Sequence, residues 1–343
     1  MYKGMGFSYI SSLKRTAGLC CLLLALGGCG KAGSPSAAGA PADTLAVPAF
    51  SADSAYAYIE RQCAFGPRVP GSEAHRACGD YLVRAFTDMG LTVTEQRATC
   101  PAFDGTPLPV RNVIASLAPE KKDRVLLCAH WDSRPWADND PEEKNRRNPV
   151  TGANDGASGV AVLMEMARQL AGATLAVGVD FICFDAEDYG MPDWEKTGDE
   201  AAEARSWCIG SQYWAAHPHR DGYRPRFGIL LDMVGGQGAR FYQEGLSLHF
   251  ARSVVANVWD AARRIGYGDF FVQKEGGFVT DDHLPLNRTA GIPTIDIIAY
   301  YPDCEQSNFG PTWHTVDDVP ARIDRSVLKA VGQTVLQVIY ETK

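Results

Sequence analysis

The chain lacks an excess of positive charge, closely spaced cysteine pairs and internal repeats. Its 343 residues carry 33 Lys and Arg against 41 Asp and Glu, giving a formal net charge of -8. This balance argues against a nucleic-acid partner, since such proteins present basic surfaces. No cysteines have the C-x-x-C spacing of a cysteine zinc site. No repeat or low-complexity segment follows residue 45, which argues against a repeat architecture.

The composition is that of a globular protein, with 45% hydrophobic and 22% charged residues. A chain of this length can bury the core of one large catalytic domain. We therefore expect residues 46–343 to form a single domain, with two smaller domains as the alternative.

Residues 1–28 are expected to be a signal peptide rather than part of the fold. Lys14 and Arg15 precede an apolar run, residues 17–26, that is too short to cross a bilayer alone. The run leads into LGGC at residues 26–29, which resembles a bacterial lipobox and implies that Cys29 carries a lipid. An ordinary cleaved signal is the alternative. Residues 29–45 are rich in Gly, Ala, Ser and Pro, which is typical of a flexible tether.

The residue after Cys29 is Gly30 and not Asp, which by resemblance to lipoprotein sorting signals favours the outer membrane, facing the periplasm. Export would expose the cysteines to an oxidising compartment. Seven cysteines follow position 29, so at least one is expected to stay unpaired within the chain. Cys128 and Cys183 lie in apolar runs and are expected to be buried thiols.

Apolar runs that end in polar residues alternate with helical patterns along the chain. The runs cover residues 124–130, 179–185, 227–232 and 292–298. Such runs are typical of strands buried on both faces of a sheet. Helical spacing of apolar residues covers residues 76–89, 160–170 and 327–335, with Gly90 as a C-terminal stop and Asp324 as an N-cap. The alternation predicts an α/β domain of three layers, with a central, mostly parallel, twisted sheet flanked by helices.

Side chains that bind metals or move protons follow several of these predicted strands. They include His130, Asp155, Glu187, Asp188, Asp232 and His314. Carboxyl ends of parallel strands meet at one edge of a sheet, where ligands bind. Buried carboxylates are costly without a cation, and imidazole with carboxylate suits zinc. The cluster therefore predicts a zinc site, although each residue alone is explained as well by a cap or a hydrogen-bonded core position.

The segments around these residues resemble the zinc aminopeptidase superfamily in order and spacing. They are GPRVPGSEAH (66–75), CAHWDSRPWAD (128–138), GANDGASGVAVLMEMAR (152–168), FDAEDYG (184–190), LLDMVGG (230–236), DDHLPL (281–286) and WHTVDD (313–318). The resemblance covers nearly all of the chain after residue 45. It implies an aminopeptidase/phosphorylase-like fold.

Two features are similar to the glutaminyl cyclases of this superfamily rather than to its peptidases. Trp313 precedes His314, where peptidases more often have Tyr, and Asp281 precedes an Asp-His pair, where peptidases commonly have Ser. The cyclase resemblance implies one zinc per chain, held by Asp155, Asp188 and His314. Asp188 departs from the usual Glu, which is longer by one methylene, so either its backbone must lie closer to the metal or the metal must shift.

The same resemblance implies the remaining roles. Glu187 would carry the proton, and His130 would support the site by hydrogen bonding without binding metal. Asp232 and Asp281 would assist catalysis, and the substrate-binding residues would be Trp313, Trp194 and Phe309.

The implied substrates are peptides or proteins with N-terminal glutamine, converted to pyroglutamate with release of ammonia by a monomeric enzyme. Two alternatives stay open. His130 and Asp232 complete the five-ligand set of a two-metal aminopeptidase. A non-catalytic binding domain on the same fold is the third interpretation. Loss of metal-ligand residues would indicate such a domain, and no ligand position is lost.

The lipobox predicts that Cys29 anchors the chain to a membrane. Each buried CH₂ of an acyl chain contributes ~0.8 kcal/mol, so release of the anchored protein should be negligible. Cys29→Ser should yield a soluble or unprocessed protein in cell fractionation. Recovery of the unaltered protein in the soluble fraction would show that the lipobox prediction is wrong.

Overall fold

A six-stranded sheet forms the centre of residues 46–343, the part of the chain that this computed structural model describes. Its strands follow the order β1-β2-β4-β3-β5-β8 and span Thr92–Pro101 (β1), Pro107–Leu117 (β2), Gly178–Phe184 (β4), Arg124–His130 (β3), Gly228–Asp232 (β5) and Thr294–Ile298 (β8). Strands β4, β3, β5 and β8 are mutually parallel, and β1 and β2 form an antiparallel hairpin at one edge. The predicted mostly parallel sheet is confirmed. The signal peptide, Cys29 and the tether lie outside the described residues.

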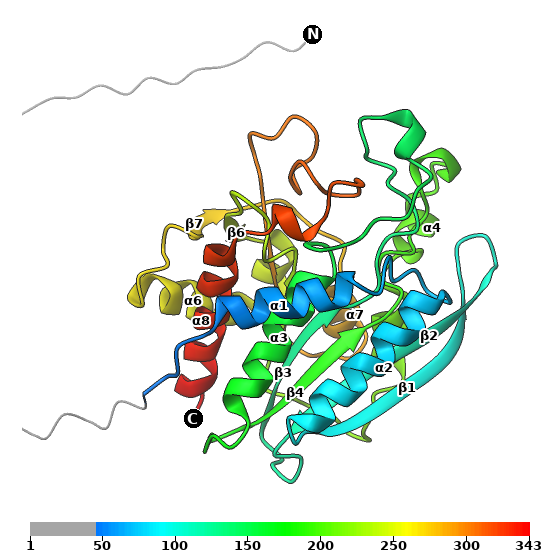
Figure 1. The fold of residues 1–343 in the computed structure, drawn as a ribbon. Helices are drawn as coiled ribbons and strands as arrows, with labels where there is room; N and C mark the ends of the chain where they lie inside the picture. Colours follow the sequence, from blue (N-terminus) through cyan, green and yellow to red (C-terminus); the bar gives the residue numbers. More distant parts are fainter. Residues whose placement is uncertain (1–45) are drawn as a thin grey trace, which may run out of the picture. The chain divides into compact units, whose positions relative to one another are not determined.

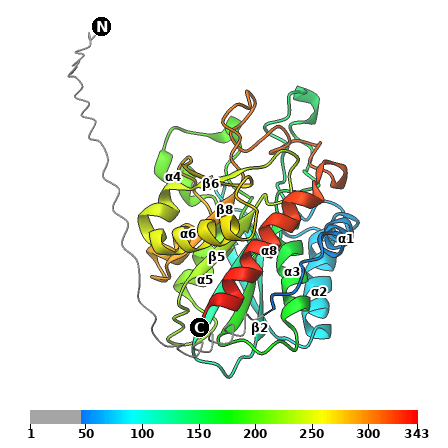
Figure 2. The ribbon, with the colours of Figure 1, turned by 90° about the vertical axis from the view of Figure 1, so that its left-hand side faces the viewer.

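Helices cover both faces of this sheet (Figures 1 and 2). Those on one face are α1 (Ala52–Cys63), α2 (Glu73–Asp88), α3 (Ala157–Leu170) and α8 (Arg325–Glu341), and those on the other are α5 (Ile209–Ala216) and α7 (His283–Arg288). Helix α6 (Gly245–Arg264) packs on β8 and α8. The smaller elements are α4 (Glu200–Arg205) and a two-stranded sheet of β6 (Phe241–Gln243) and β7 (Phe271–Glu275). Three short 3₁₀ turns cover Glu143–Asn145, Asp193–Glu195 and Pro320–Arg322.

Alternate residues of β3 contribute to the two hydrophobic cores on opposite faces of the sheet. Val125 and Leu127 point into the larger core beneath α1, α2, α3 and α8. Leu126 and Cys128 point into the smaller core beneath α5 and α7. All four side chains are fully buried. The two-sided burial explains why these strands read as continuous apolar runs.

Two helix boundaries confirm the signals in the sequence. Gly90 follows α2 with φ +85°, a left-handed conformation that favours glycine. The Asp324 carboxylate accepts a 2.8 Å hydrogen bond from the Ser326 backbone N–H at the start of α8. These caps fix the lengths of two helices that cover the sheet.

All seven cysteines of the described residues are free thiols, and Cys128 and Cys183 are fully buried, as predicted. Within residues 46–343, no helix combines the length and apolarity needed to span a bilayer.

A buried ion pair joins β3 and β4 near their amino ends. Asp180 accepts hydrogen bonds from Arg124 at 2.6 Å (Nε) and 2.7 Å (Nη2). The hydroxyl groups of Ser116 and Tyr223 donate to the same carboxylate at 2.5 Å and 2.7 Å. Every oxygen of this carboxylate therefore has a donor, which compensates for its burial.

Asp180→Ala should lower the free energy of unfolding by about 3–5 kcal/mol, because it leaves the Arg124 charge buried without a partner. The matched control is Asp123→Ala, which breaks an exposed pair with Arg226 and should cost much less. Urea denaturation of both variants measures the difference. Equal losses would contradict the importance of the buried pair.

Candidate active site

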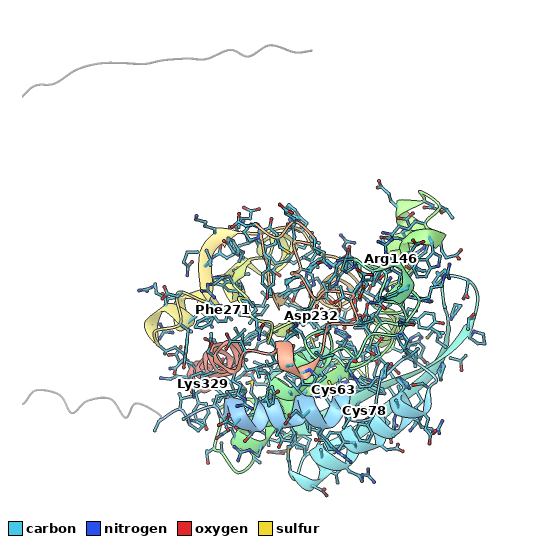
Figure 3. All side chains as sticks on the ribbon, turned by 45° about the horizontal axis from the view of Figure 1, so that its top comes forward. Cys63, Cys78, Arg146, Asp232, Phe271 and Lys329 are labelled. Carbon is cyan, nitrogen blue, oxygen red and sulfur yellow. The ribbon has the colours of Figure 1, made fainter. Side chains whose placement is uncertain are left out.

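A pocket of about 240 Å³ lies beyond the carboxyl ends of β4, β5 and β8. The loops that follow β4 (green) and β8 (orange) lie in the upper part of Figure 1. Asp232, at the end of β5, lies near the centre of the view in Figure 3. The pocket wall contains most residues predicted for the site, namely Asp155, Glu187, Asp188, Asp232, Asp281, Phe309, Trp313 and His314.

The three predicted zinc ligands converge on one point. Asp155, Asp188 and His314 each offer a ligand atom, and these atoms lie within 4.8 Å of one another. His314 Nε2 is 3.2 Å from Asp188 Oδ1 and 3.7 Å from Asp155 Oδ2. Both carboxylate oxygens of Asp188 are buried and have no hydrogen-bond partner. Such a carboxylate is costly to bury without a cation, so the donor set fits zinc.

The His314 ring is held from its other side. Its Nδ1 lies 3.2 Å from Asp138 Oδ1. Arg134 donates hydrogen bonds to the same carboxylate from Nε at 2.7 Å and from Nη2 at 2.5 Å. Burial alone would raise the pKa of Asp138, but the hydrogen bonds from Arg134 and His314 lower it below its usual range. An ionised Asp138 fixes the proton on Nδ1 and leaves Nε2 free to bind metal.

The backbone beside the two Asp ligands is held by further carboxylates. Asp318 accepts hydrogen bonds from the backbone N–H groups of Asn154 (2.8 Å) and Asp155 (3.0 Å). Asp132 accepts from the N–H groups of Glu187 (3.1 Å) and Asp188 (3.2 Å). The loop after β4 is thereby held close enough for the short Asp188 side chain to approach His314.

Gly156 allows the Asp155 loop to pass close to β3. Its φ is +96°, in the left-handed region, and a Cβ atom here would lie 2.5 Å from the Asp132 carbonyl oxygen. A larger residue would therefore push Asp155 away from the site.

A second ligand-type group overlaps the first. His130 Nε2 lies 3.0 Å from Asp155 Oδ1 and 3.2 Å from Asp232 Oδ1. Burial alone would lower the pKa of His130, but hydrogen bonds with Asp132, Asp155 and Asp232 raise it well above its usual value. Two carboxylates therefore lie within hydrogen-bonding distance of His130. The same three residues also have the geometry of a metal site that shares Asp155 with the first.

A group of protonatable side chains lies beside these triads. Glu187, Asp281 and Cys208 bring one oxygen or sulfur atom each within 4.8 Å of one another. Burial raises the pKa of Glu187 well above its usual value, and the charges of Asp281 and Asp188 add to this effect. Burial and the charge of Asp232 raise the pKa of Asp281 to about 7. Crowded carboxylates of this kind can hold and release protons near neutral pH.

Aromatic rings form the remaining wall, with one departure from the prediction. Phe309 and Trp313 line the pocket, their ring centroids 4.9 Å apart. Trp194 does not line it. Trp194 lies in the 3₁₀ turn Asp193–Glu195. Its ring packs edge-to-face on Trp136, with the ring centroids 6.3 Å apart, and the Arg147 guanidinium lies over it. The predicted substrate contact of Trp194 therefore has no geometric support.

The structure adds two aromatic residues that the sequence analysis missed. Trp207 lines the pocket and stacks on His314 at 5.9 Å. It lies in the same segment between β4 and α5 as Trp194, so position in the sequence alone could not separate the two. Phe278 also lines the pocket and is 71% exposed at its rim. Its only signal was its place just before the predicted Asp281 segment.

Fold and site together define a metal-binding enzyme of the aminopeptidase-like class. The chain belongs to peptidase family M28, a family of zinc-dependent enzymes, whose model matches residues 112–339. This match contains all the ligand-type residues described above.

Two solved structures of bacterial glutaminyl cyclases are similar to this chain. The enzyme of Bacteroides thetaiotaomicron, bound to N-acetylhistamine, is 51% identical, with a TM-score of 0.84 over 87% of this chain and 100% of that one. The enzyme of Porphyromonas gingivalis is 48% identical, with a TM-score of 0.81 over 86% of this chain and 99% of that one. Other structures of similar identity are named as a leucine aminopeptidase precursor and a Zn-dependent exopeptidase.

Aminopeptidase YwaD of Bacillus subtilis is 28% identical over 80% of this chain. The match spans 54% of that relative's length. Proteins named for each of the two activities are thus similar to this chain, and the choice between the activities depends on the site.

Asp138→Asn should weaken zinc binding by roughly 10–100-fold, because a neutral amide no longer fixes the His314 proton. Competition with a chelator measures the affinity, and Asp193→Asn, on the exposed turn, is the control. An unchanged affinity for Asp138→Asn would show that His314 needs no such orientation.

Proposed function

We propose that the chain is a glutaminyl-peptide cyclotransferase, which closes the N-terminal glutamine of peptides and proteins to pyroglutamate and releases ammonia. The observation that carries the proposal is the protonatable pair Glu187 and Asp281, which shares one small pocket with the triad of Asp155, Asp188 and His314. Similar structures of glutaminyl cyclases support it.

The cyclisation reaction does not require a metal to activate water. The substrate's own α-amine attacks its own γ-carbonyl, so the nucleophile is already tethered and no water needs activation. Zinc held by Asp155, Asp188 and His314 would polarise the γ-carbonyl and stabilise the developing oxyanion. One metal can supply this chemistry, whereas peptide hydrolysis benefits from a second metal that helps to form hydroxide.

Glu187 would move the proton. Its buried carboxylate, with its raised pKa, would take the proton from the attacking amine and return it to the departing ammonia. Asp281 and Asp232 would support Glu187, since carboxylates this close cannot all ionise. A hydrogen bond at 3.3 Å from Cys208 Sγ to Glu187 Oε1 fixes one oxygen of the base.

The pocket suits a substrate that inserts one residue. At about 240 Å³ it is smaller than the ~300–1,000 Å³ of typical ligand pockets. Trp313, Phe309 and Trp207 would pack against the aliphatic part of the glutamine side chain. The rest of the peptide would remain outside, beyond the rim at Phe278.

A two-metal aminopeptidase is the second candidate, and one observation favours it. The triad of His130, Asp155 and Asp232 has metal-site geometry beside the first triad, so the five-ligand set is intact. The Bacillus subtilis relative carries that activity in its name.

An assay of the purified protein separates the two candidates. Peptides with N-terminal glutamine should release ammonia and gain pyroglutamate, measured by coupled enzymatic assay and mass spectrometry, while amino-acid anilides should be left intact. Hydrolysis of leucine anilide, without ammonia from glutamine peptides, would overturn the cyclase proposal in favour of the peptidase.

Glu187→Gln should reduce kcat by on the order of 10²–10⁴, the usual contribution of a positioned acid-base group, while zinc content stays at the unaltered level. The amide keeps the size of the side chain but cannot carry the proton. Stopped assays and metal analysis of the same preparation provide the two readings. Near-normal turnover would show that another group moves the proton.

A further inference from the structure

Cys208 contacts the proposed base at two points. Its backbone N–H donates to the Glu187 carbonyl at 2.9 Å, and its thiol donates to Glu187 Oε1 at 3.3 Å. Cys208 adopts a left-handed backbone conformation with φ +58°, unusual for a residue with a side chain. The turn thereby holds a sulfur atom beside the carboxylate.

Asp281 completes a group of three ligand-type side chains. One atom from each of Glu187, Cys208 and Asp281 lies within 4.8 Å of the other two, and all three residues are buried. Asp281 is 3% exposed, and its Oδ2 has no hydrogen-bond partner. An unpartnered carboxylate oxygen in this setting needs a cation or a proton.

Solvent cavities reach this group from two sides. Glu187 and Asp281 line the 240 Å³ pocket described above. Cys208 and Asp281 line a neighbouring cavity of about 400 Å³, and the two cavities share Trp207 and Thr280. Asp281 lines both cavities, so the group lies between them and beside the triad of Asp155, Asp188 and His314.

We propose that Glu187, Cys208 and Asp281 form an additional, inhibitory site for a thiophilic divalent cation such as Zn²⁺. Thiolate and carboxylate ligands suit zinc, whose structural and catalytic sites use both. On binding, the Cys208 S–H bond breaks, its proton passes to solvent, and sulfur binds the metal together with one oxygen from each carboxylate. Glu187 is then occupied and cannot exchange protons with substrate. The loss of turnover rests on the proposed function, but the binding itself does not.

Sulfur distinguishes this site from the two triads. Both triads consist of His and Asp only, whereas the inhibitory site contains a cysteine. Cadmium bound to thiolate has an ultraviolet charge-transfer absorption that oxygen and nitrogen ligands lack. The probe therefore reports the new site even if cadmium also exchanges into a triad.

The direct test is a cadmium titration of the zinc-loaded enzyme. The unaltered protein should develop the thiolate band at one equivalent per chain, and Cys208→Ser should not. Cys304→Ser, which removes a half-buried thiol from a surface loop, is the matched control and should keep the band. No band in the unaltered protein, or an undiminished band in Cys208→Ser, would overturn the site.

The functional test uses excess Zn²⁺ and the substrate that the enzyme proves to turn over. Serine keeps a hydroxyl donor for Glu187 but removes the soft ligand. Cys208→Ser should therefore need roughly 10–100-fold more Zn²⁺ for half-inhibition, each variant being compared with its own zinc-limited rate. Equal sensitivity of Cys208→Ser and Cys304→Ser would refute inhibition through this site. A cadmium band without cyclase activity would retain the metal site and reject the proposed function.

Discussion

The carboxylates crowded at one edge of the central sheet are the constraint on which the site depends. Asp188 is buried with neither oxygen hydrogen-bonded, and Asp155 faces two histidines at once. Such an arrangement is unfavourable unless nearby positive charge balances it, because each buried carboxylate loses its hydration. A metal bound by Asp155, Asp188 and His314 would therefore join three loops that are far apart in the sequence.

Hydrogen bonds within the scaffold hold the backbone around these crowded carboxylates. Asp132 and Asp318 do not belong to the triad of Asp155, Asp188 and His314. Each of them accepts hydrogen bonds from backbone N–H groups of a segment that contains a candidate ligand. Arg134 places a permanent positive charge beside Asp138 and 3.6 Å from Asp188. These contacts would limit the conformational entropy lost when the candidate ligands bind a metal.

The parallel strands, their helices and the ligand segments could be predicted from the sequence because their signals are local. The run at residues 124–130 coincides with β3, and the caps at Gly90 and Asp324 are where the sequence places them. The β1–β2 hairpin had no such signal, since β1 is a largely exposed edge strand without an apolar run. Pairing at an edge depends on a distant partner rather than on periodicity.

Two features of the site could not be predicted, because they too depend on residues that are distant in the sequence. The choice between Trp194 and Trp207 depends on the path of one irregular loop, and residue type gives no guide to that path. The role of His130 depends on whether Asp155 and Asp232 share a proton or a metal, and both arrangements need the same residues. The sequence defines the ligands that are available, whereas the number of ions depends on the charge balance of the folded site.

Metal content is therefore the measurement that tests the account most directly. We predict one tightly bound zinc per chain after dialysis against zinc-free buffer, lost in His314→Ala and retained in His130→Ala. Binding should also stabilise the fold, since the three ligands come from separate loops. Two tightly bound zinc ions per active chain, with His130→Ala reducing the count to one, would contradict the single-zinc site and favour the two-metal aminopeptidase.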